Sequence, residues 1–241
     1  MSGNKYIGKE LEIFSHAKNW KSYYGSLIKP YFGERLLEVG AGLGTTTSSL
    51  YDSRVRDWFC LEPDESFISL LRGKIHSGEL PPACKAKPGT INDLEVDDVY
   101  DTIIYIDVME HIQDDHAESH AAARHLKPGG RLIVLAPAHP WMFTPFDQAI
   151  GHFRRYSKIS LEKIKPVSCE QEKLVYLDSL GMLLSCANKI LLKQSLPTIK
   201  QILFWDRWIV PFSKILDRGL MYRMGRSMVT VWRKRDDPSH P

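Results

Sequence analysis

The amino-acid sequence predicts a doubly wound α/β fold, organised as a single domain over residues 1–241. Two observations carry this prediction: short apolar runs alternate with helix-length segments, and a glycine-rich turn follows the first apolar run. Such alternation is typical of parallel βαβ units with right-handed crossovers. The chain has 241 residues and 43% hydrophobic content, which is enough to bury one sizeable core.

Apolar runs that each open onto a turn or a helix are the expected buried strands. They are Arg35–Val39, Asp57–Glu62, Ala83–Lys87, Tyr100–Ile106 and Gly130–Ala136, with two later strands at Glu172–Ser179 and Ser227–Lys234. Between them we expect helices at Thr45–Tyr51, Asp64–His76 and Asp114–Leu126. A polar and aromatic helix is expected at Gly8–Lys29, because Pro30 stops it, and residues 1–33 would form an N-terminal helical cap.

Residues 180–226 separate the last two predicted strands and are rich in Leu, Ile, Trp and Met. We expect a helical insertion here, serving as an acceptor-side cap or a dimer face. Ordinary core helices are the alternative. The basic, aromatic stretch Phe204–Arg235, with Trp205, Trp208 and Phe212, could instead rest on a membrane surface.

Composition and charge exclude several classes of protein. The net charge is only +3, from 32 Lys and Arg against 29 Asp and Glu, so coating of nucleic acid is not expected. Four scattered cysteines show no metal-binding spacing. Neither a secretory signal nor a run of about 20 apolar residues is evident. We therefore expect a cytoplasmic protein with at most peripheral membrane contact.

The strongest motif is LLEVGAGLGTTT, in which Glu38 lies in the first strand and Gly40, Ala41, Gly42 and Gly44 form the turn after it. Alternate glycines let a ligand lie against bare main chain. Dinucleotide-binding folds favour G-x-G-x-x-G, which places a pyrophosphate on a helix N-terminus. The third glycine here comes one residue earlier, which favours an adenosyl ligand without phosphates.

Two acidic positions follow the next strands. Glu62 ends the second strand about 20 residues after Gly40, the offset at which a carboxylate meets ribose hydroxyls in such folds. Asp93, beside Leu94, follows the third strand and suits an adenine, whose amino group donates and whose ring face is apolar. Each acid alone could be a solvated loop carboxylate, but the pair favours a nucleoside site.

These segments resemble the motifs of the class I S-adenosylmethionine (SAM)-dependent methyltransferases, in the family's order, over Leu36–Pro137. EVGAGLGTTT resembles the first motif, CLEPD the ribose motif, GTINDL the adenine motif, YDTIIYIDVMEHI the fourth-strand motif and LKPGGRLIVLAP the fifth. The resemblance implies a Rossmann-like sheet of seven strands with the last one antiparallel, and SAM as the cofactor.

The resemblance also implies roles for single residues. Glu38 and the loop Gly40–Gly44 would lie near the methionine part, Glu62 and Pro63 at the ribose, Asp93 and Leu94 at the adenine, Asp107 beside the methionine or sulfonium, and Trp20 over the cofactor.

His111 and His139 follow the fourth and fifth strands, where open α/β sheets place their ligands. Either could act as a general base for a hydroxyl acceptor, or could merely stabilise its loop. The grouping Asp107, Glu110 and His111 is similar to the Mg²⁺ ligands of some catechol-type and RNA-end methyltransferases, but Asp107 stands where those enzymes carry Glu. We expect no metal.

A GHxRRY-like segment holds His152, Arg154, Arg155 and Tyr156. It resembles a segment found in a bacterial subgroup of small-molecule methyltransferases. These side chains could clamp an anionic acceptor, or form an internal ion-pair network with Asp147 or Asp206.

The sequence therefore predicts methyl transfer from SAM to an O or N atom of a small or lipid-like, anionic acceptor. Two alternatives remain: a non-catalytic SAM-binding module that activates a partner, and a NAD(P)-dependent oxidoreductase, which the glycine spacing disfavours. No nucleic-acid partner is expected, and a homodimer remains open.

Overall fold

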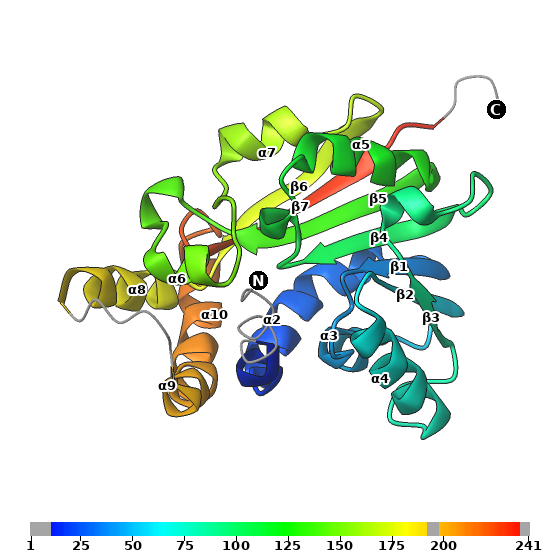
Figure 1. The fold of residues 1–241 in the computed structure, drawn as a ribbon. Coiled ribbons are helices and arrows are strands. Elements are labelled where there is room, and N and C mark those ends of the chain that lie inside the picture. The colour runs from blue at the N-terminus through cyan, green and yellow to red at the C-terminus, as the bar shows by residue number, and fades with distance from the viewer. Residues whose placement is uncertain (1–10, 192–197, 237–241) are drawn as a thin grey trace.

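A computed structural model describes residues 11–191 and 198–236 and is built around one seven-stranded sheet (Figure 1). In chain order the strands are β1 Arg35–Val39, β2 Asp57–Glu62, β3 Cys84–Pro88, β4 Tyr100–Ile106, β5 Leu126–Pro137, β6 Cys169–Leu177 and β7 Ser227–Lys234. Their order across the sheet is β3-β2-β1-β4-β5-β7-β6, and β7 runs antiparallel to both neighbours. The predicted fold class is confirmed.

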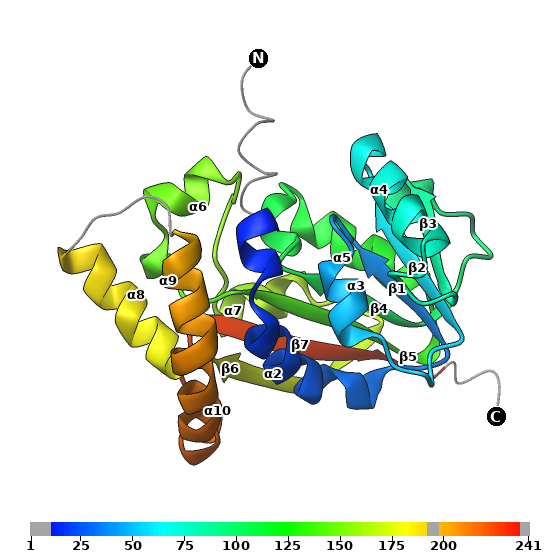
Figure 2. The ribbon, with the colours of Figure 1, turned by 90° about the horizontal axis from the view of Figure 1, so that it is seen from below.

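Helices cover both faces of the sheet (Figures 1 and 2). They are α2 Lys18–Ile28, α3 Thr45–Leu50, α4 Glu65–His76, α5 Asp115–Arg124, α6 Pro145–Ala149, α7 Lys158–Ile164, α8 Ser179–Leu191, α9 Ile199–Phe204 and α10 Val210–Gly219, preceded by a helical segment at residues 11–15. Helices α2, α3 and α4 lie on one face with α10, whereas α5 and α7 lie on the other. A π-helical turn, Trp205–Ile209, joins α9 to α10.

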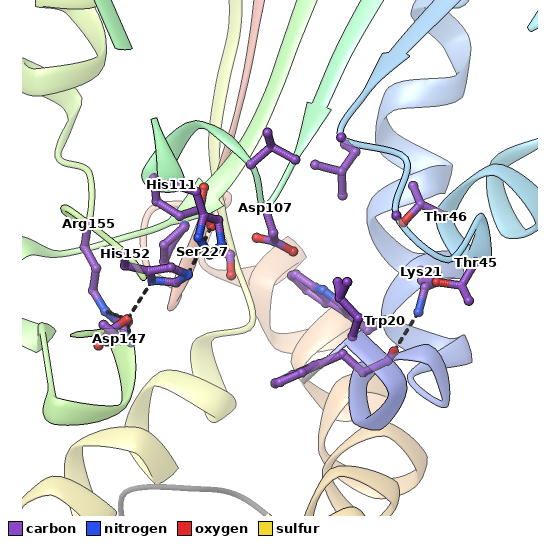
Figure 3. Close-up of a pocket in the computed structure, with 18 of the residues that line it drawn as sticks. Trp20, Lys21, Thr45, Thr46, Asp107, His111, Asp147, His152, Arg155 and Ser227 are labelled. Atoms are coloured by element: carbon purple, nitrogen blue, oxygen red, sulfur yellow. Dashed lines mark hydrogen bonds and ion pairs between the residues drawn. The ribbon is translucent and has the colours of Figure 1, made fainter. Parts of the chain in front are cut away.

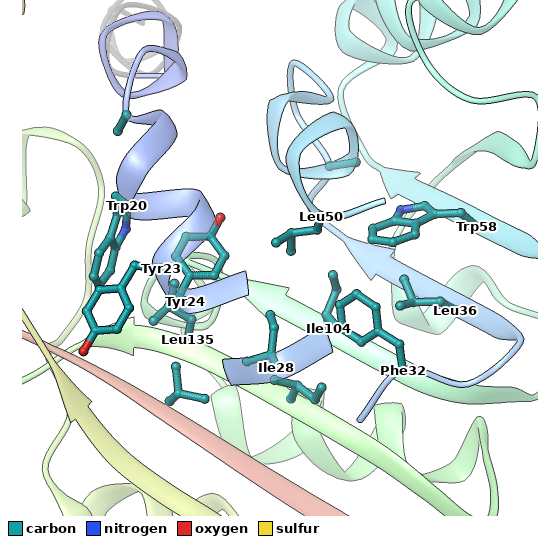
Figure 4. Packing of buried hydrophobic residues seen from close by; sticks show 14 of the residues in the cluster. Trp20, Tyr23, Tyr24, Ile28, Phe32, Leu36, Leu50, Trp58, Ile104 and Leu135 are labelled. Atoms are coloured by element: carbon teal, nitrogen blue, oxygen red, sulfur yellow. The ribbon is translucent and has the colours of Figure 1, made fainter. Parts of the chain in front are cut away.

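Two hydrophobic clusters sandwich the sheet. The cluster under α2 and α3 is rich in aromatic residues, and Phe32 meets Trp58 edge to face with ring centroids 5.8 Å apart (Figure 4). The second cluster packs α5 and α7 on the opposite face, around Tyr105 and Trp232. Because both faces are covered, strands β1 and β4 are apolar along most of their length, as is typical of parallel sheets.

The expected helix Gly8–Lys29 is interrupted, and its first residues, 8–10, lie outside the described part of the chain. A short helical segment ends near Ser15, and α2 starts anew at Lys18. The Asp206 carboxylate accepts hydrogen bonds from the backbone N–H groups of Asn19 and Trp20, at 3.0 and 2.8 Å. A carboxylate at a helix N-terminus satisfies orphan donors and the helix dipole, so a distant residue sets this helix start.

Two later strands differ from the predicted bounds. β5 begins at Leu126, because Tyr100 of β4 already pairs with Leu126 across a register shift. β6 begins at Cys169 and stops at Leu177, because Asp178 adopts a left-handed conformation (φ 65°) that leads into α8. Strands β1, β2, β4 and β7 match their predicted bounds, since their apolar runs coincide with the buried lengths.

The carboxyl ends of the central parallel strands lie along the same edge of the sheet. The chain passes from β1 to β2 on one side, whereas β4 lies on the other side of β1. The loops after β1 and β4 therefore diverge and leave a crevice at the carboxyl ends, where doubly wound sheets bind ligands.

Candidate functional site

A cavity of about 1490 Å³ opens at the carboxyl ends of β1, β2 and β4. Its walls come from the loops after these strands, from the segment around α6, and from α2, α8 and α9. Pockets for one small ligand are typically about 300–1,000 Å³. This cavity therefore has room for two molecules side by side.

The glycine-rich loop forms one wall, with Gly40, Ala41 and Gly42 lining the cavity. Gly40 and Gly42 are left-handed, at φ 72° and 50°, a region that side chains rarely adopt. A Cβ on Gly40 would come within 2.7 Å of Val108, whereas one on Gly42 would meet only Leu11, at 3.5 Å. Gly42 thus presents bare main chain to open space, as the sequence predicts for a ligand cradle.

Glu62 and Pro63 line the same cavity. The Glu62 carboxylate accepts hydrogen bonds from the backbone N–H of Gly42 at 2.8 Å and of Asp64 at 3.1 Å. Burial raises the pKa of Glu62, and the two backbone bonds partly offset this effect. Each carboxylate oxygen keeps a lone pair, so Glu62 can hold the loop and still accept ligand hydroxyls.

Glu38 and Gly44, by contrast, do not line the cavity. The Glu38 carboxylate turns into the core, where it accepts hydrogen bonds from Thr47 at 2.6 Å and from Trp58 at 2.8 Å. Burial raises its pKa to about 7. Gly44, at φ 70°, caps α3 against Leu71. Both residues shape the loop from behind, and their contact with a cofactor stays a prediction.

Asp93 and Leu94 are likewise absent from the cavity wall. The exposed Asp93 carboxylate accepts hydrogen bonds from the Thr90 backbone N–H and hydroxyl, both at 2.7 Å, in a capping box of a short 3₁₀ turn. Gly89, Thr90 and Asn92 line the cavity instead. The loop after β3 therefore borders the cavity, and contact of Asp93 and Leu94 with a cofactor stays a prediction.

Asp107 and Trp20 face each other across the cavity (Figure 3). Asp107 directly follows β4 in a left-handed conformation (φ 54°), and non-glycine residues in this region are concentrated at functional sites. Burial raises the pKa of Asp107 to about 6, although His152, Arg226 and Lys21 lower it in part. Protein surrounds this carboxyl group, yet it remains open to the cavity.

Lys21 is a cavity residue that the sequence analysis missed. Its ammonium donates a hydrogen bond to the Phe14 carbonyl at 2.7 Å. Burial lowers its pKa to about 8, and Asp107 and Asp206 partly oppose this shift. Nothing in the local sequence indicates that Lys21 faces a cavity. Only the packing of α2 turns this side chain inward.

His111 and His152 meet edge to face, with ring centroids 4.5 Å apart, and both line the cavity. Burial and the neighbouring His152 lower the pKa of His111 to about 4, so its ring is neutral at pH 7. The ligand atoms of Glu110, His111 and His152 all lie within 4.8 Å of one another, so this trio could hold a metal ion. The sequence predicts acceptor binding for His152 instead.

His139 lies outside the cavity wall. Its Nε2 bonds to the Gly225 carbonyl at 2.9 Å, and its ring stacks on Tyr176 with centroids 5.2 Å apart. Burial lowers its pKa. The ring is held between β6 and the Gly225 turn, and the role of His139 as a base stays a prediction.

The GHxRRY-like segment divides between the cavity and the interior. Arg155 lines the cavity and forms a two-pronged ion pair with Asp147, at 2.9 and 3.0 Å. His152 Nδ1 lies 3.1 Å from the same carboxylate. Burial raises the pKa of Asp147, but the hydrogen bonds from His152 and Arg155 outweigh it and keep this pKa low.

Arg154 and Tyr156 point away from the cavity. Arg154 pairs with Asp115 at 2.5 Å, and the Tyr156 hydroxyl donates to Asp115 at 2.7 Å. The proposed ion-pair network is therefore present, with Asp147 and Asp115 as its acids, whereas Asp206 caps α2. Arg154 and Tyr156 anchor the segment through Asp115, and their contact with an acceptor stays a prediction.

Arg226 is a further cavity cation, and it was also missed. Its Nε lies 3.1 Å from the Asp178 carboxylate, and its guanidinium stacks 4.3 Å from the centre of the Trp205 ring. Trp205, expected on a membrane-facing surface, is buried and donates its indole N–H to Asp178 at 2.8 Å. Arg226 stands one residue before β7, and only the antiparallel return of that strand brings it to the site.

The loops that build this cavity match a known family. Residues 37–134 match the family model described as methyltransferase domain. This region, which is less than half of the chain, is therefore similar to a methyltransferase domain. The matched region runs from β1 to β5 and contains the glycine-rich loop, Glu62, Asp107 and His111 of the cavity wall. The family match indicates SAM as the cofactor of this methyltransferase domain.

Solved structures share the fold of the methyltransferase domain at low sequence identity. A chain of the Haloferax volcanii complex that contains the Trm112 methyltransferase activator is 16% identical, with a TM-score of 0.62, covering 95% of this chain and 93% of its own. The N-methyltransferase NodS of Bradyrhizobium japonicum, solved with S-adenosyl-L-homocysteine, is 10% identical, with a TM-score of 0.56, covering 89% and 86%.

The [4+2]-cyclase SpnF also shares the fold, at 13% identity and a TM-score of 0.62, covering 96% of both chains. Its name shows that the fold alone does not fix the reaction. No curated protein sequence matches the chain significantly. Among the described residues, no helix is both long and apolar enough to span a bilayer.

Proposed function

We propose that this protein transfers a methyl group from SAM to an O or N atom of a small-molecule or lipid-like, anionic acceptor. One observation carries the proposal: the bare glycine loop, Glu62 and Asp107 line a single cavity that has room for two ligands. The acceptor would occupy the part of the cavity lined by His152 and Arg155.

The cavity residues fit SAM chemically. Gly40 and Gly42 offer main chain without side chains, and Glu62 can accept both ribose hydroxyls. Gly89, Thr90 and Asn92 would border the adenine. Asp107 carries negative charge for the methionine ammonium or the sulfonium, and Trp20 closes the site from α2.

SAM supplies an activated methyl group, so the protein must mainly align the acceptor and exclude water. Trp20 and Trp205 provide apolar walls, with ring centroids 5.8 Å apart. Of the two histidines predicted as bases, only His111 borders this space. Neutral at pH 7, it can take a proton from an acceptor hydroxyl, whereas a neutral amine needs no base.

Two cations favour an anionic acceptor. Arg155 and Arg226 both line the cavity, and each is held by a carboxylate, Asp147 or Asp178. Such paired guanidiniums are preorganised and keep donors for carboxylate or phosphate oxygens. The N-terminal cap (1–33) and the helical insertion (180–226) would close the site over the acceptor. Parts of both ranges lie outside the described residues.

A non-catalytic SAM-binding module that activates a partner is the second candidate. A neighbour in fold was solved with a methyltransferase activator, and SpnF is named as a cyclase. The open second half of the cavity favours catalysis over this candidate. An oxidoreductase is disfavoured because the matching family is a methyltransferase domain.

Calorimetry of the full chain with SAM and with NADH tests the cofactor. We expect heat with SAM and its demethylated product, and none with NADH. Incubation with isotope-labelled SAM and separate polar and lipid extracts, followed by mass spectrometry, then tests transfer. SAM binding without any labelled product in either extract would support the non-catalytic module.

A further inference from the structure

Helix α9, the π-helical turn and α10 form one continuous rod on the flank of the molecule (Figure 2). Its inner face is buried, through Ile202, Trp205 and Val210. Its outer face exposes large apolar side chains that are adjacent or three to four residues apart. They are Ile199, Leu203, Phe204, Trp208, Phe212, Ile215 and Leu216, here called the apolar ridge.

The acidic residues of this rod are buried, whereas its basic residues are not. Its two acids, Asp206 and Asp217, are buried: Asp206 caps α2, and Asp217 accepts hydrogen bonds from Tyr23 at 2.7 Å and from backbone N–H groups. The other charged residues between the ridge side chains and just beyond them are not buried, and all of them are basic. They are Lys200, Arg207, Lys214, Arg218 and Arg223.

The cavity reaches this same surface. Leu184 of α8 and Phe204 of the apolar ridge are exposed to solvent and also line the cavity. Lys200 and Gln201 complete this part of the wall. The apolar ridge and the cavity wall therefore share Phe204, beside Lys200 and Gln201.

We propose that the apolar ridge seats on an anionic lipid bilayer and that the acceptor is a lipid-borne anion drawn from it. The statement about the acceptor rests on the proposed function. Helices that lie in a membrane interface carry bulky apolar residues on one side and Lys or Arg beside them, and anionic headgroups attract such cations. The ridge has both features, and its acids are withdrawn from the surface.

A second copy of the chain fits this surface less well. In a symmetric dimer the same patch faces itself, so the five cations of one copy would meet those of the other. Like charges brought together across an interface are unfavourable. An anionic bilayer instead complements the cations and covers the aromatic side chains.

Sedimentation of the full chain with vesicles tests the proposal. Vesicles of phosphatidylcholine with phosphatidylglycerol are compared with phosphatidylcholine alone, at low and high salt. We expect at least tenfold greater retention on the anionic vesicles, weakened by salt. Equal recovery in the pellet with and without vesicles would overturn the proposal.

The double variant Trp208→Glu/Phe212→Glu changes two ridge residues that are 52% and 59% exposed and do not line the cavity. Retention should fall at least tenfold, with melting temperature and SAM heat preserved. The matched control, Ile159→Glu/Val167→Glu, changes residues that are 72% and 80% exposed outside the rod and should keep retention.

Full retention of the ridge variant would contradict the docking surface. A second outcome would also contradict it: the wild-type protein is a dimer, the ridge variant is a monomer, and neither binds vesicles. A second copy of the chain would then cover the ridge. Vesicle binding without SAM heat would reject the proposed function but keep the surface. Binding heat with SAM but no vesicle binding would keep the proposed function and reject the membrane surface.

Discussion

The backbone N–H of Gly42 donates a hydrogen bond to the Glu62 carboxylate at 2.8 Å and thereby ties the glycine loop after β1 to the end of β2. The same carboxylate also accepts a hydrogen bond from the backbone N–H of Asp64, the residue that precedes α4. One side chain therefore sets the shape of the loop and faces the ligand space, and the first prediction tests both roles.

Replacing Glu62 with Gln puts an amide NH₂ where an acceptor oxygen stood. Either Gly42 or Asp64 then loses its partner, which costs about 1–3 kcal/mol when the group is buried. We expect SAM affinity to fall at least tenfold, measured by calorimetry. The control Asp64→Asn changes the neighbouring exposed cap residue and should leave affinity within about twofold. Equal affinities for both variants would remove Glu62 from the site.

Gly42→Ala tests the open main chain of the loop. The new methyl group meets only Leu11 at 3.5 Å, but φ of 50° strains any side chain, at about 1 kcal/mol or more. Gly78→Ala is a matched control, since Gly78 has φ 78° and no neighbour within 4 Å, and it does not line the cavity. Both variants should lose similar stability in urea, but only Gly42→Ala should lose SAM affinity.

The buried Glu38 predicts a pH dependence of stability. Burial raises its folded pKa to about 7, above the ordinary glutamate value of 4.5, so the unfolded state releases its proton at lower pH. Unfolding free energy should therefore decline as pH rises from about 4.5 to about 7 and then level off. Glu38→Gln should flatten this decline, by on the order of 2 kcal/mol. Parallel pH profiles for both proteins would contradict a protonated Glu38.

Arg155→Ala tests the ion pair with Asp147, whose carboxylate is buried. Leaving a buried carboxylate without its guanidinium typically costs about 3–5 kcal/mol, and the bond from His152 should reduce this cost. We expect a loss of about 2–3 kcal/mol in urea denaturation. Arg131→Ala, which breaks a surface pair with Glu172, should cost less than about 1 kcal/mol. A loss from Arg155→Ala no larger than that of the control would show that the pair is not stabilising.

The sequence by itself determined the sheet and the cofactor loop, because both depend on local pattern. Apolar runs bounded by turns define β1, β2, β4 and β7, and the glycine spacing defines a left-handed loop whatever packs around it. Glu62, Asp107 and His111 could be predicted as cavity residues because parallel strands bring their carboxyl ends to one edge.

Only the tertiary structure decided which neighbouring side chain faces the ligand space. Glu38 turned toward Trp58, Asp93 toward Thr90, and His139 toward Gly225, while Lys21 and Arg226 reached the cavity. Hydrogen-bond partners in the core and loops draw these groups, and those partners come from distant segments or from a precise turn geometry. A linear pattern places a residue on an element, but the packing of that element sets where its side chain points.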